Sequence, residues 1–257
     1  MVAAQVLLMV ACTAPGAQPP PVELTVFGAA SLGGVLAEAK VAYEAAVPGT
    51  RLVLSTDSSS ALQTQIEQGA PADLFLSADT ANPQLLVDGG LADGQAVPFA
   101  GNLLTIIVPS DGPTRVAAPV DLAADGVEIV AAGDEVPITG YAVRAVENMG
   151  RLRGYPADFA ARYAANIVSH EDDVKAIVAK IGLGEGDAGI VYVTDARGSS
   201  SVATVPIPAE ANDRAAYAGV VVRASPHHQA ARAFLDWLRG PDGQAILTGS
   251  GFLPAPS

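Results

Sequence analysis

One short stretch near the start of the chain decides the fold class: Val26-Phe27-Gly28-Ala29-Ala30-Ser31-Leu32. Residues 24–27 predict a short apolar strand, and the small residues 28–30 keep its exit free of bulk. Ser31 stands where a helix N-cap is expected, ahead of a helix with one apolar face. A small-residue turn between a strand and a helix leaves free N–H groups at the helix start. The stretch therefore predicts a βα unit whose turn is either an ordinary cap or an anion site.

Apolar strands and amphipathic helices alternate along the rest of the chain. We expect further strands at residues 51–55, 73–76, 103–108, 127–131, 166–168, 188–192 and 217–223. We expect further helices at residues 58–69, 83–89, 140–149, 156–164, 171–181 and 229–238. This alternation indicates an α/β fold with largely parallel strands.

Two long apolar strands, 103–108 and 218–222, are separated by a complete α/β unit. If the chain leaves one lobe along the first and returns along the second, these are crossover strands between two lobes. The predicted division is residues 22–101 plus 221–257 for lobe I and residues 102–220 for lobe II. A cleft between such lobes, lined by helix starts, is a common place for a small ligand.

Composition narrows the class of partner. Half of the 257 residues are hydrophobic, which is enough for one large core or two modest ones. The net charge of −13 argues against nucleic acid and against an anionic membrane surface, because both would repel the chain. A small anion is still compatible, since local N–H dipoles bind anions even in an acidic protein.

The single cysteine lies in a distinctive N-terminal segment. An apolar run at residues 6–11 ends at Cys12, and the Pro-rich residues 13–21 follow. The segment resembles a bacterial lipoprotein signal, in which Cys12 becomes the lipid-modified first residue of the mature chain. Residues 1–21 are then signal and semi-rigid tether, and the protein is extracytoplasmic and held at the membrane by lipid only. A buried N-terminal helix with an inert thiol is the alternative.

Four more places match the first stretch in character. They are Ser59 in the turn 57–60, the helix start 136–141, the helix start at residues 172–174, and Tyr192 at the end of a buried strand. Each alone is more often a cap or a core residue than a ligand site. Together, however, they offer donors at four helix starts and one phenol, and these are distributed over both predicted lobes. This distribution favours a site for an anion between the lobes.

With these pieces in place, the sequence resembles the molybdate-binding proteins of bacterial ABC importers, the ModA family. The matching segments are residues 26–32, 58–62, 69–79 (Gly-Ala-Pro-Ala-Asp-Leu-Phe-Leu-Ser-Ala-Asp), 136–137, 171–174 and 189–196 (Gly-Ile-Val-Tyr-Val-Thr-Asp-Ala). They occur in the family's order and cover essentially everything after residue 22. The resemblance implies a two-lobed, type II-like periplasmic binding protein fold. It also implies a tetrahedral oxyanion held by two serines, three backbone amides and a tyrosine.

The family's ligand set can be carried over by position. The resemblance implies hydroxyl donors at Ser31, Ser59 and Tyr192 and amide donors at Ile138 and Val174, with the amides of residues 30, 31 and 59 as helpers. Where many relatives have Val-Pro-Ala-Gly, this chain has Val-Pro-Ile-Thr-Gly at 136–140, so Thr139 is an alternative donor to Ile138. Asp57 brings a carboxylate near the site, and we expect it to point outward.

The implied function is an extracytoplasmic solute-binding protein that captures molybdate or tungstate and delivers it to an ABC permease and ATPase. Molybdenum would be held only as the oxyanion, through the same five residues, with no direct cation ligands and no cofactor. A site made of donors alone disfavours hydrogen phosphate, whose proton needs an acceptor, and must reject sulfate by size. A binder of another tetrahedral oxyanion such as sulfate is the alternative. We expect a monomer.

Other classes have less support. The three histidines, His170, His227 and His228, show no metal-type spacing, and no Gly-x-Ser-x-Gly motif occurs, so we expect no enzyme. Acidic residues 171–173 suit the first turn of a helix without any bound cation. The histidine pair before the last amphipathic helix is expected at the surface. A purely structural surface domain would not need donor-rich turns on both sides of a cleft.

Overall fold

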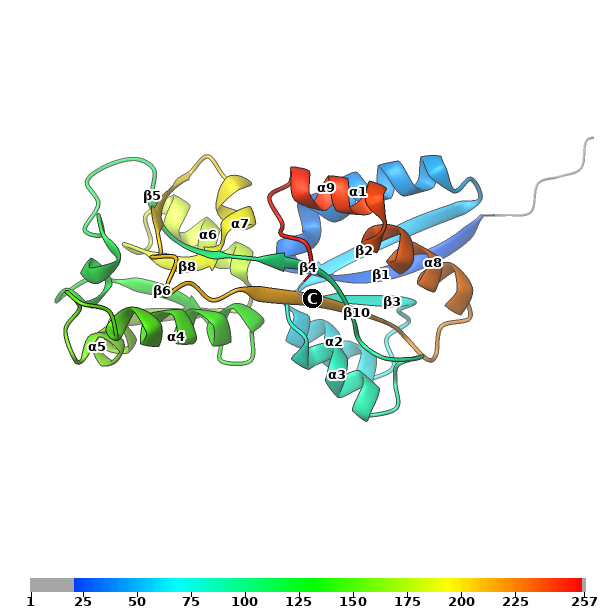
Figure 1. Ribbon diagram of the computed structural model, residues 1–257, viewed down its shortest axis with the longest axis horizontal. Helices are drawn as coiled ribbons and strands as arrows, with labels where there is room; N and C mark the ends of the chain where they lie inside the picture. The colour runs from blue at the N-terminus through cyan, green and yellow to red at the C-terminus, as the bar shows by residue number, and fades with distance from the viewer. Residues whose placement is uncertain (1–20, 256–257) are drawn as a thin grey trace, which may run out of the picture.

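The computed structural model describes residues 21–255, which form two α/β lobes placed end to end (Figure 1). Lobe I contains a five-stranded sheet in the order β2-β1-β3-β10-β4. Its strands are β1 (Val22–Ala29), β2 (Thr50–Asp57), β3 (Leu74–Ser77), β4 (Val97–Asn102) and β10 (Ala215–Val221). Its helices are the 3₁₀ turn η1 (Ala30–Leu32), α1 (Gly33–Ala46), α2 (Ser59–Glu67), α3 (Ala81–Asp88), α8 (His228–Arg239) and α9 (Pro241–Gly249).

Lobe II contains a three-stranded sheet in the order β8-β5-β9 and a separate pair, β6 with β7. The strands are β5 (Leu104–Pro109), β6 (Ile129–Ala132), β7 (Ile167–Glu171), β8 (Gly189–Tyr192) and β9 (Val202–Pro206). The helices are the 3₁₀ turn η2 (Pro119–Ala123), α4 (Pro137–Gly150), α5 (Phe159–Ala165), α6 (Val174–Leu183) and α7 (Val193–Arg197). Every strand and helix expected from the sequence is therefore present, with ends shifted by a few residues.

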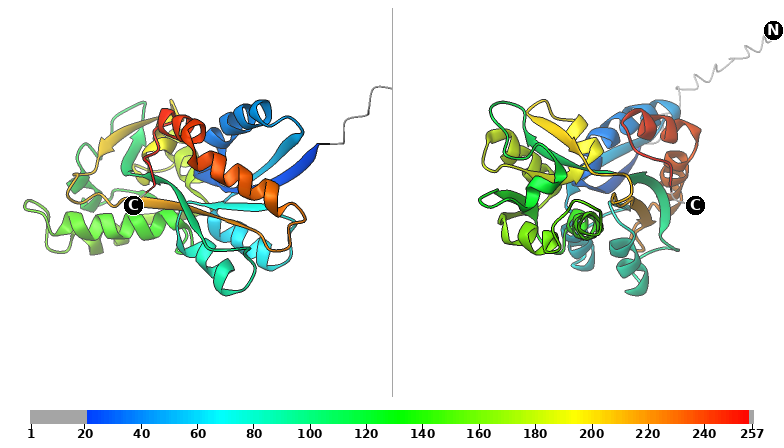
Figure 2. Two further views of the ribbon diagram at one scale, coloured as in Figure 1. Left: turned by 45° about the vertical axis from the view of Figure 1, so that its right-hand side comes forward. Right: turned by 60° about the vertical axis from the view of Figure 1, so that its left-hand side comes forward.

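Two chain segments connect the lobes, as Figures 1 and 2 show. One is the consecutive pair β4 and β5, and the other is the chain that returns through β10. The prediction of two crossover segments is confirmed. The division at residues 101/102 and 220/221 stays a prediction, and β10 pairs with β3 and β4 in the sheet of lobe I.

The expectation of largely parallel strands is wrong. The β1–β2, β1–β3 and β6–β7 pairs are parallel, whereas the pairs made by β10 and by β5 are antiparallel. The reason lies in the two crossovers. A strand that leaves a lobe and a strand that returns to it run in opposite directions, and sequence alternation alone does not reveal this.

The opening stretch packs as its small residues predict. Gly28 lies near the end of β1, where an added Cβ would collide with Cδ1 of Leu36 on α1. Leu36 is fully buried, so the absence of a side chain at position 28 lets α1 lie close against the sheet. The absence of a side chain at the end of β1 therefore helps to set the position of the start of α1.

The N-terminal predictions fall largely outside the described residues. Cys12 and the rest of the proposed signal and tether, apart from Pro21, precede residue 21. Among residues 21–255 no helix is both long enough and apolar enough to cross a membrane.

Candidate functional site

All five residues of the predicted ligand set line one small cavity between the lobes. The cavity is lined by Ala29, Ala30, Ser31, Ser58, Ser59 and Ala78 from lobe I, and by Val136, Pro137, Ile138, Asp173, Val174 and Tyr192 from lobe II. Its volume, counted for the centre of a water-sized sphere, is about 10 Å³. That is close to the least space that admits a single water. The donors therefore converge on a space smaller than a tetrahedral oxyanion, which would enter only if the two lobes moved apart.

Ser31 is not the helix cap that the sequence suggested. It lies in the 3₁₀ turn η1, and α1 begins two residues later with Leu32 as its N-cap. Its hydroxyl is engaged elsewhere: Oγ of Ser31 lies 3.0 Å from the hydroxyl of Tyr217 on β10. Ser31 is buried in the cavity wall, with a polar partner 186 residues away in the sequence.

Ser59 is the first residue of α2, one position after the cap. Ser58 is the N-cap, and its hydroxyl accepts from the amide of Ala61 at 3.3 Å. Ser59 Oγ instead accepts from the amide of Ala78 at 3.0 Å, so its own hydrogen is free to be donated. Asp57 accepts from the Ser58 amide at 2.7 Å and does not line the cavity, in agreement with the expectation that it points away.

Lobe II presents two helix starts to the same cavity. Ile138 is the second residue of α4 and Val174 is the first residue of α6. First-turn amides have no acceptor within their helix, and the helix dipole favours an anion beside them. α4 starts at Pro137, three residues before the expected start, because proline fits the first turn of a helix.

Thr139 does not replace Ile138 at the cavity. Its hydroxyl donates to the carbonyls of Ala132 at 3.1 Å and Gly133 at 2.8 Å, and its amide donates to the carbonyl of Val136. Thr139 thus closes the turn before α4. The structure places Ile138, and not Thr139, in the cavity wall.

Tyr192 supplies the most informative atom of the site. The side chain is 1% exposed, and its hydroxyl has no hydrogen-bond partner within residues 21–255. Burial, reinforced by the neighbouring Tyr217, raises the pKa of Tyr192 well above its ordinary value, so the group stays a hydroxyl. A buried polar group without a partner costs about 1–3 kcal/mol. Such a group is expected to donate to something that occupies the cavity.

The acidic residues 171–173 separate into different roles. Glu171 ends β7 and pairs with Lys180, whose Nζ lies 2.7 Å from Oε1, so it is not part of the helix start as expected. Asp173 is the N-cap of α6 and accepts from the amide of Ala176 at 2.9 Å. Residues 21–255 contain no group of three or more His, Cys, Asp or Glu side chains arranged to hold a metal ion.

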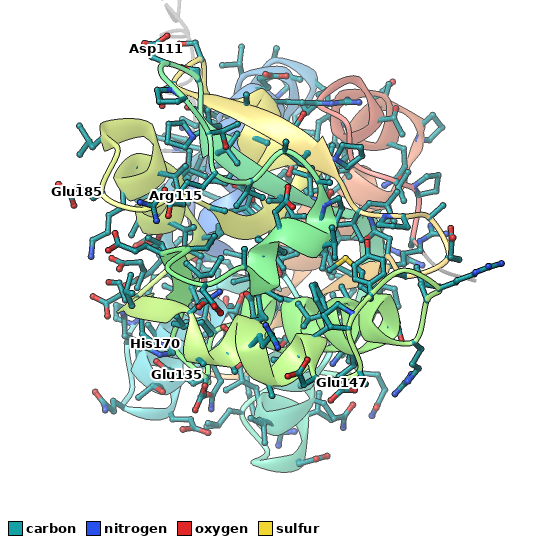
Figure 3. All side chains as sticks on the ribbon, turned by 90° about the vertical axis from the view of Figure 1, so that its left-hand side faces the viewer. Asp111, Arg115, Glu135, Glu147, His170 and Glu185 are labelled. Carbon is teal, nitrogen blue, oxygen red and sulfur yellow. The ribbon has the colours of Figure 1, made fainter. Side chains whose placement is uncertain are left out.

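The histidines lie away from the cavity. Nδ1 of His170 donates to the carbonyl oxygen of Ala132 at 3.2 Å, and the side chain lies on the outer face of lobe II (Figure 3). His227, expected simply at the surface, is partly covered, with Nδ1 3.2 Å from Oδ1 of Asp73. Neither residue lines the cavity between the lobes.

Two polar residues near Ser31 and Tyr192, neither of them in the cavity wall, were not identified as site residues from the sequence. Tyr217, which meets Ser31, stood inside a predicted strand with nothing local to mark its hydroxyl. Asp195 follows Tyr192 closely, and its Oδ2 is buried without a partner in the described part of the chain. Burial raises the pKa of Asp195 to about 7, although the positive charge of Lys175 acts to lower it. The sequence shows an acidic residue after a buried strand, but it does not show the burial.

Comparison with known proteins bears on the family and the fold. The family described as "Bacterial extracellular solute-binding protein" matches residues 24–253. The molybdate-binding protein ModA of Mycobacterium tuberculosis (strain H37Rv) is 32% identical over 230 residues, which are 89% of this chain and 84% of that protein. A solved structure, the substrate binding domain of a putative molybdenum ABC transporter from Clostridium difficile, matches with a TM-score of 0.68 and 28% identity, covering 91% of this chain and 100% of that chain.

A relative of another class also matches. The aconitate isomerase of Pseudomonas sp is 26% identical over 256 residues, which are 97% of this chain and 95% of that protein. The resemblance stated from sequence motifs is confirmed by these findings, and so is the two-lobed α/β fold.

Proposed function

The chain belongs to the bacterial extracellular solute-binding protein family, and we propose that it captures molybdate outside the cytoplasm and delivers it to an ABC importer. One observation carries the choice of ligand class. The cavity between the lobes is small, and the five predicted residues around it offer hydroxyl and amide donors, including the buried Tyr192 hydroxyl that has no partner in residues 21–255.

The energetics suit a dianion. Each hydrogen bond to a charged group contributes about 1.5–3 kcal/mol net, and a helix start adds a few tenths to roughly 2 kcal/mol. Ser31, Ser59 and Tyr192 would donate through hydroxyls, and Ile138 and Val174 through amides. These donors are all neutral, so they can bind an anion without a positively charged side chain. This explains how a protein with a net charge of −13 can bind a dianion.

The same donors give the proposed selectivity. Molybdate, tungstate and sulfate carry no proton at neutral pH, whereas hydrogen phosphate needs an acceptor that the donor set does not offer. We propose that molybdate and tungstate bind alike and that sulfate, being smaller, reaches fewer donors. Sulfate as the physiological ligand remains the alternative.

We propose that the protein acts as a binder and not as an enzyme, despite its similarity to an aconitate isomerase. Aconitate carries three carboxylates on a carbon chain, and the residues around the cavity include no Lys or Arg to pair with them. The residues around the cavity also hold no histidine, and their one carboxylate, that of Asp173, is used as a helix cap.

A thermal-shift experiment tests the ligand. Molybdate held at about 100 times its dissociation constant should stabilise the protein by about 2.7 kcal/mol, and tungstate should do the same. Sulfate, phosphate and aconitate at equal concentration should shift the melting temperature far less. An equal shift with sulfate would favour the sulfate alternative, and a shift with aconitate together with its isomerisation would contradict the proposed binding-only role.

The attachment to the membrane is a separate proposal, which concerns Cys12 outside the described residues. We propose that Cys12 carries lipid and that the protein is otherwise a monomer. The full chain expressed in its bacterial host should partition into detergent, and Cys12→Ser should move it to the aqueous phase. Equal partitioning of both chains would rule out the lipid anchor, and gel filtration of the Cys12→Ser chain measures the oligomeric state.

A further inference from the structure

A chain of buried polar side chains leads from the strands between the lobes to Ser31. Asn102 ends β4, and Tyr217 lies on β10; neither is exposed at all. The amide nitrogen Nδ2 of Asn102 lies 3.4 Å from the Tyr217 hydroxyl, which lies 3.0 Å from Oγ of Ser31. We call this the Asn102–Tyr217–Ser31 relay. Its last member is a wall residue of the anion cavity.

The direction of the first hydrogen bond is set by the backbone. The amide of Leu103 donates to Oδ1 of Asn102 at 2.9 Å. A backbone N–H can only donate, so the side-chain atom that faces it is the oxygen. The other side-chain atom is therefore the NH₂ group. It uses its two hydrogens toward Oγ1 of Thr194, at 2.9 Å, and toward the hydroxyl of Tyr217.

The second hydrogen bond then has only one consistent direction. Tyr217 accepts from Asn102, and burial raises the pKa of Tyr217 well above its ordinary value, so it keeps its own hydrogen. Within residues 21–255, the partner positioned to accept that hydrogen is Oγ of Ser31. Ser31 accepts from Tyr217, and its own hydrogen is left to point elsewhere.

Ser59 gives an independent parallel inside the same site. Its Oγ accepts from the amide of Ala78 at 3.0 Å, a group that can only donate. Ser59 is thus oriented directly by a backbone amide. Ser31 has the hydroxyl of Tyr217 in the same position, and a hydroxyl can reverse unless a further group fixes its direction.

We propose that Asn102 and Tyr217 are positioning residues that direct the hydroxyl hydrogen of Ser31 toward a bound oxyanion. This inference rests on the proposed function. In the intact relay, Tyr217 occupies one lone pair of the Ser31 oxygen and the Ser31 hydrogen is directed at the anion. With the relay broken, the Ser31 hydroxyl turns freely and accepts the proton of hydrogen phosphate. The relay therefore acts on selectivity as well as on affinity.

A double-mutant cycle between Tyr217→Phe and Ser31→Ala tests the relay, with calorimetric titration of molybdate, tungstate, sulfate and hydrogen phosphate at pH 8. Loss of one hydrogen bond to a charged ligand predicts about tenfold weaker molybdate binding for Ser31→Ala. Tyr217→Phe should weaken binding by roughly threefold to tenfold, with no further loss when Ser31 is already alanine. In the Tyr217→Phe variant, the preference for molybdate over hydrogen phosphate should be lower than in the wild type.

Tyr141→Phe is the matched control. Tyr141 also contacts β10, where its hydroxyl accepts from the Ala216 amide at 3.2 Å, and within residues 21–255 it makes no hydrogen bond to Ser31 or Ser59. Its ring packs edge-on against Tyr192, and this ring is kept in the phenylalanine variant. It should leave the preference for molybdate over hydrogen phosphate unchanged. Asn102→Ala is a second way to break the relay, and its effect should likewise vanish in the Ser31→Ala background.

The outcomes separate this inference from the proposed function. If the wild type binds molybdate but the Tyr217 and Ser31 losses add fully, the relay is wrong and the proposed function stands. If Tyr217→Phe leaves both affinity and selectivity unchanged, the relay is also wrong. If the wild type binds none of the four anions, the proposed function fails, and the relay fails with it because no oxyanion then receives the Ser31 hydrogen.

Discussion

The two sides of the cavity differ in how their side-chain hydroxyls are paired. In lobe I, Ser31 and Ser59 each have a partner within the protein, the hydroxyl of Tyr217 and the amide of Ala78. In lobe II, the Tyr192 hydroxyl and Oδ2 of the nearby Asp195 are buried without partners in the described residues. One side is thus satisfied before a ligand arrives, whereas the other carries polar groups that the fold itself leaves unpaired.

The two sides therefore illustrate two kinds of hydroxyl donor, one already hydrogen-bonded in the empty protein and one not. A hydroxyl that already accepts one hydrogen bond is oriented at no cost to the empty protein, and the ligand adds a second bond. A buried hydroxyl without a partner lowers the stability of the empty protein by about 1–3 kcal/mol and gains its first bond from the ligand. Substitutions on the two sides should therefore affect the unliganded fold with opposite signs.

The largest effect is expected at Asp195, through pH. Its pKa of about 7 lies above the ordinary value of 3.8, so folding favours the protonated form. The stability that this group contributes is complete below pH 3.8 and is lost as the pH rises through 7, amounting to roughly 4 kcal/mol. Asp195→Asn should remove that loss. Urea unfolding at pH 5, 6, 7 and 8 measures both chains, and parallel profiles would contradict the assignment.

Tyr192→Phe should separate stability from binding. We expect the unliganded variant to be more stable by about 1–3 kcal/mol, because an unpaired buried hydroxyl is removed. Molybdate binding should weaken by about 1.5–3 kcal/mol, which is tenfold or more. Thermal unfolding without anion and calorimetric titration with molybdate provide the two values. A variant that is destabilised when empty would show that the hydroxyl has a partner after all.

Ser31→Ala and Ser59→Ala should lose binding to a similar extent but with the opposite change in stability. Each should weaken molybdate binding by about 1.5–3 kcal/mol and destabilise the unliganded fold by about 1 kcal/mol. The second loss comes from the bonds to Tyr217 and Ala78, since neither serine is the N-cap that the sequence suggested. The same two measurements apply. Serine variants that bind like the wild type would place the anion elsewhere.

The smallest change in affinity is expected at Ile138 and Val174. Both are proposed to bind through their amides, so Ile138→Val and Val174→Ala keep the donor and should alter molybdate affinity by less than about 0.5 kcal/mol, within the usual range for changes that touch no special feature. Both side chains are buried, so some loss of stability is expected from the missing methyl groups. Titration is compared with Ser59→Ala, and a tenfold loss would show that these side chains, and not only their amides, shape the cavity.

The sequence by itself determined the local features of this protein. Small residues at 28–30, the serine turn at 58–60, and helix starts near residues 138 and 174 depend on neighbours in the chain, and so they could be identified from order and spacing. The five cavity residues themselves came from the family resemblance, which carried each role over by position. The structure then placed all five around one cavity.

Only the tertiary structure decided which partners those residues have. Ser31 meets Tyr217 across 186 residues, and Asn102 meets Tyr217 across 115. The burial of Asp195 and the missing partner of Tyr192 likewise depend on how lobe II closes over them. The physical reason is that hydrogen-bond direction and desolvation are set by atoms that surround a group in space. Antiparallel return through β10 brings those atoms together, and no local pattern of residues encodes that return.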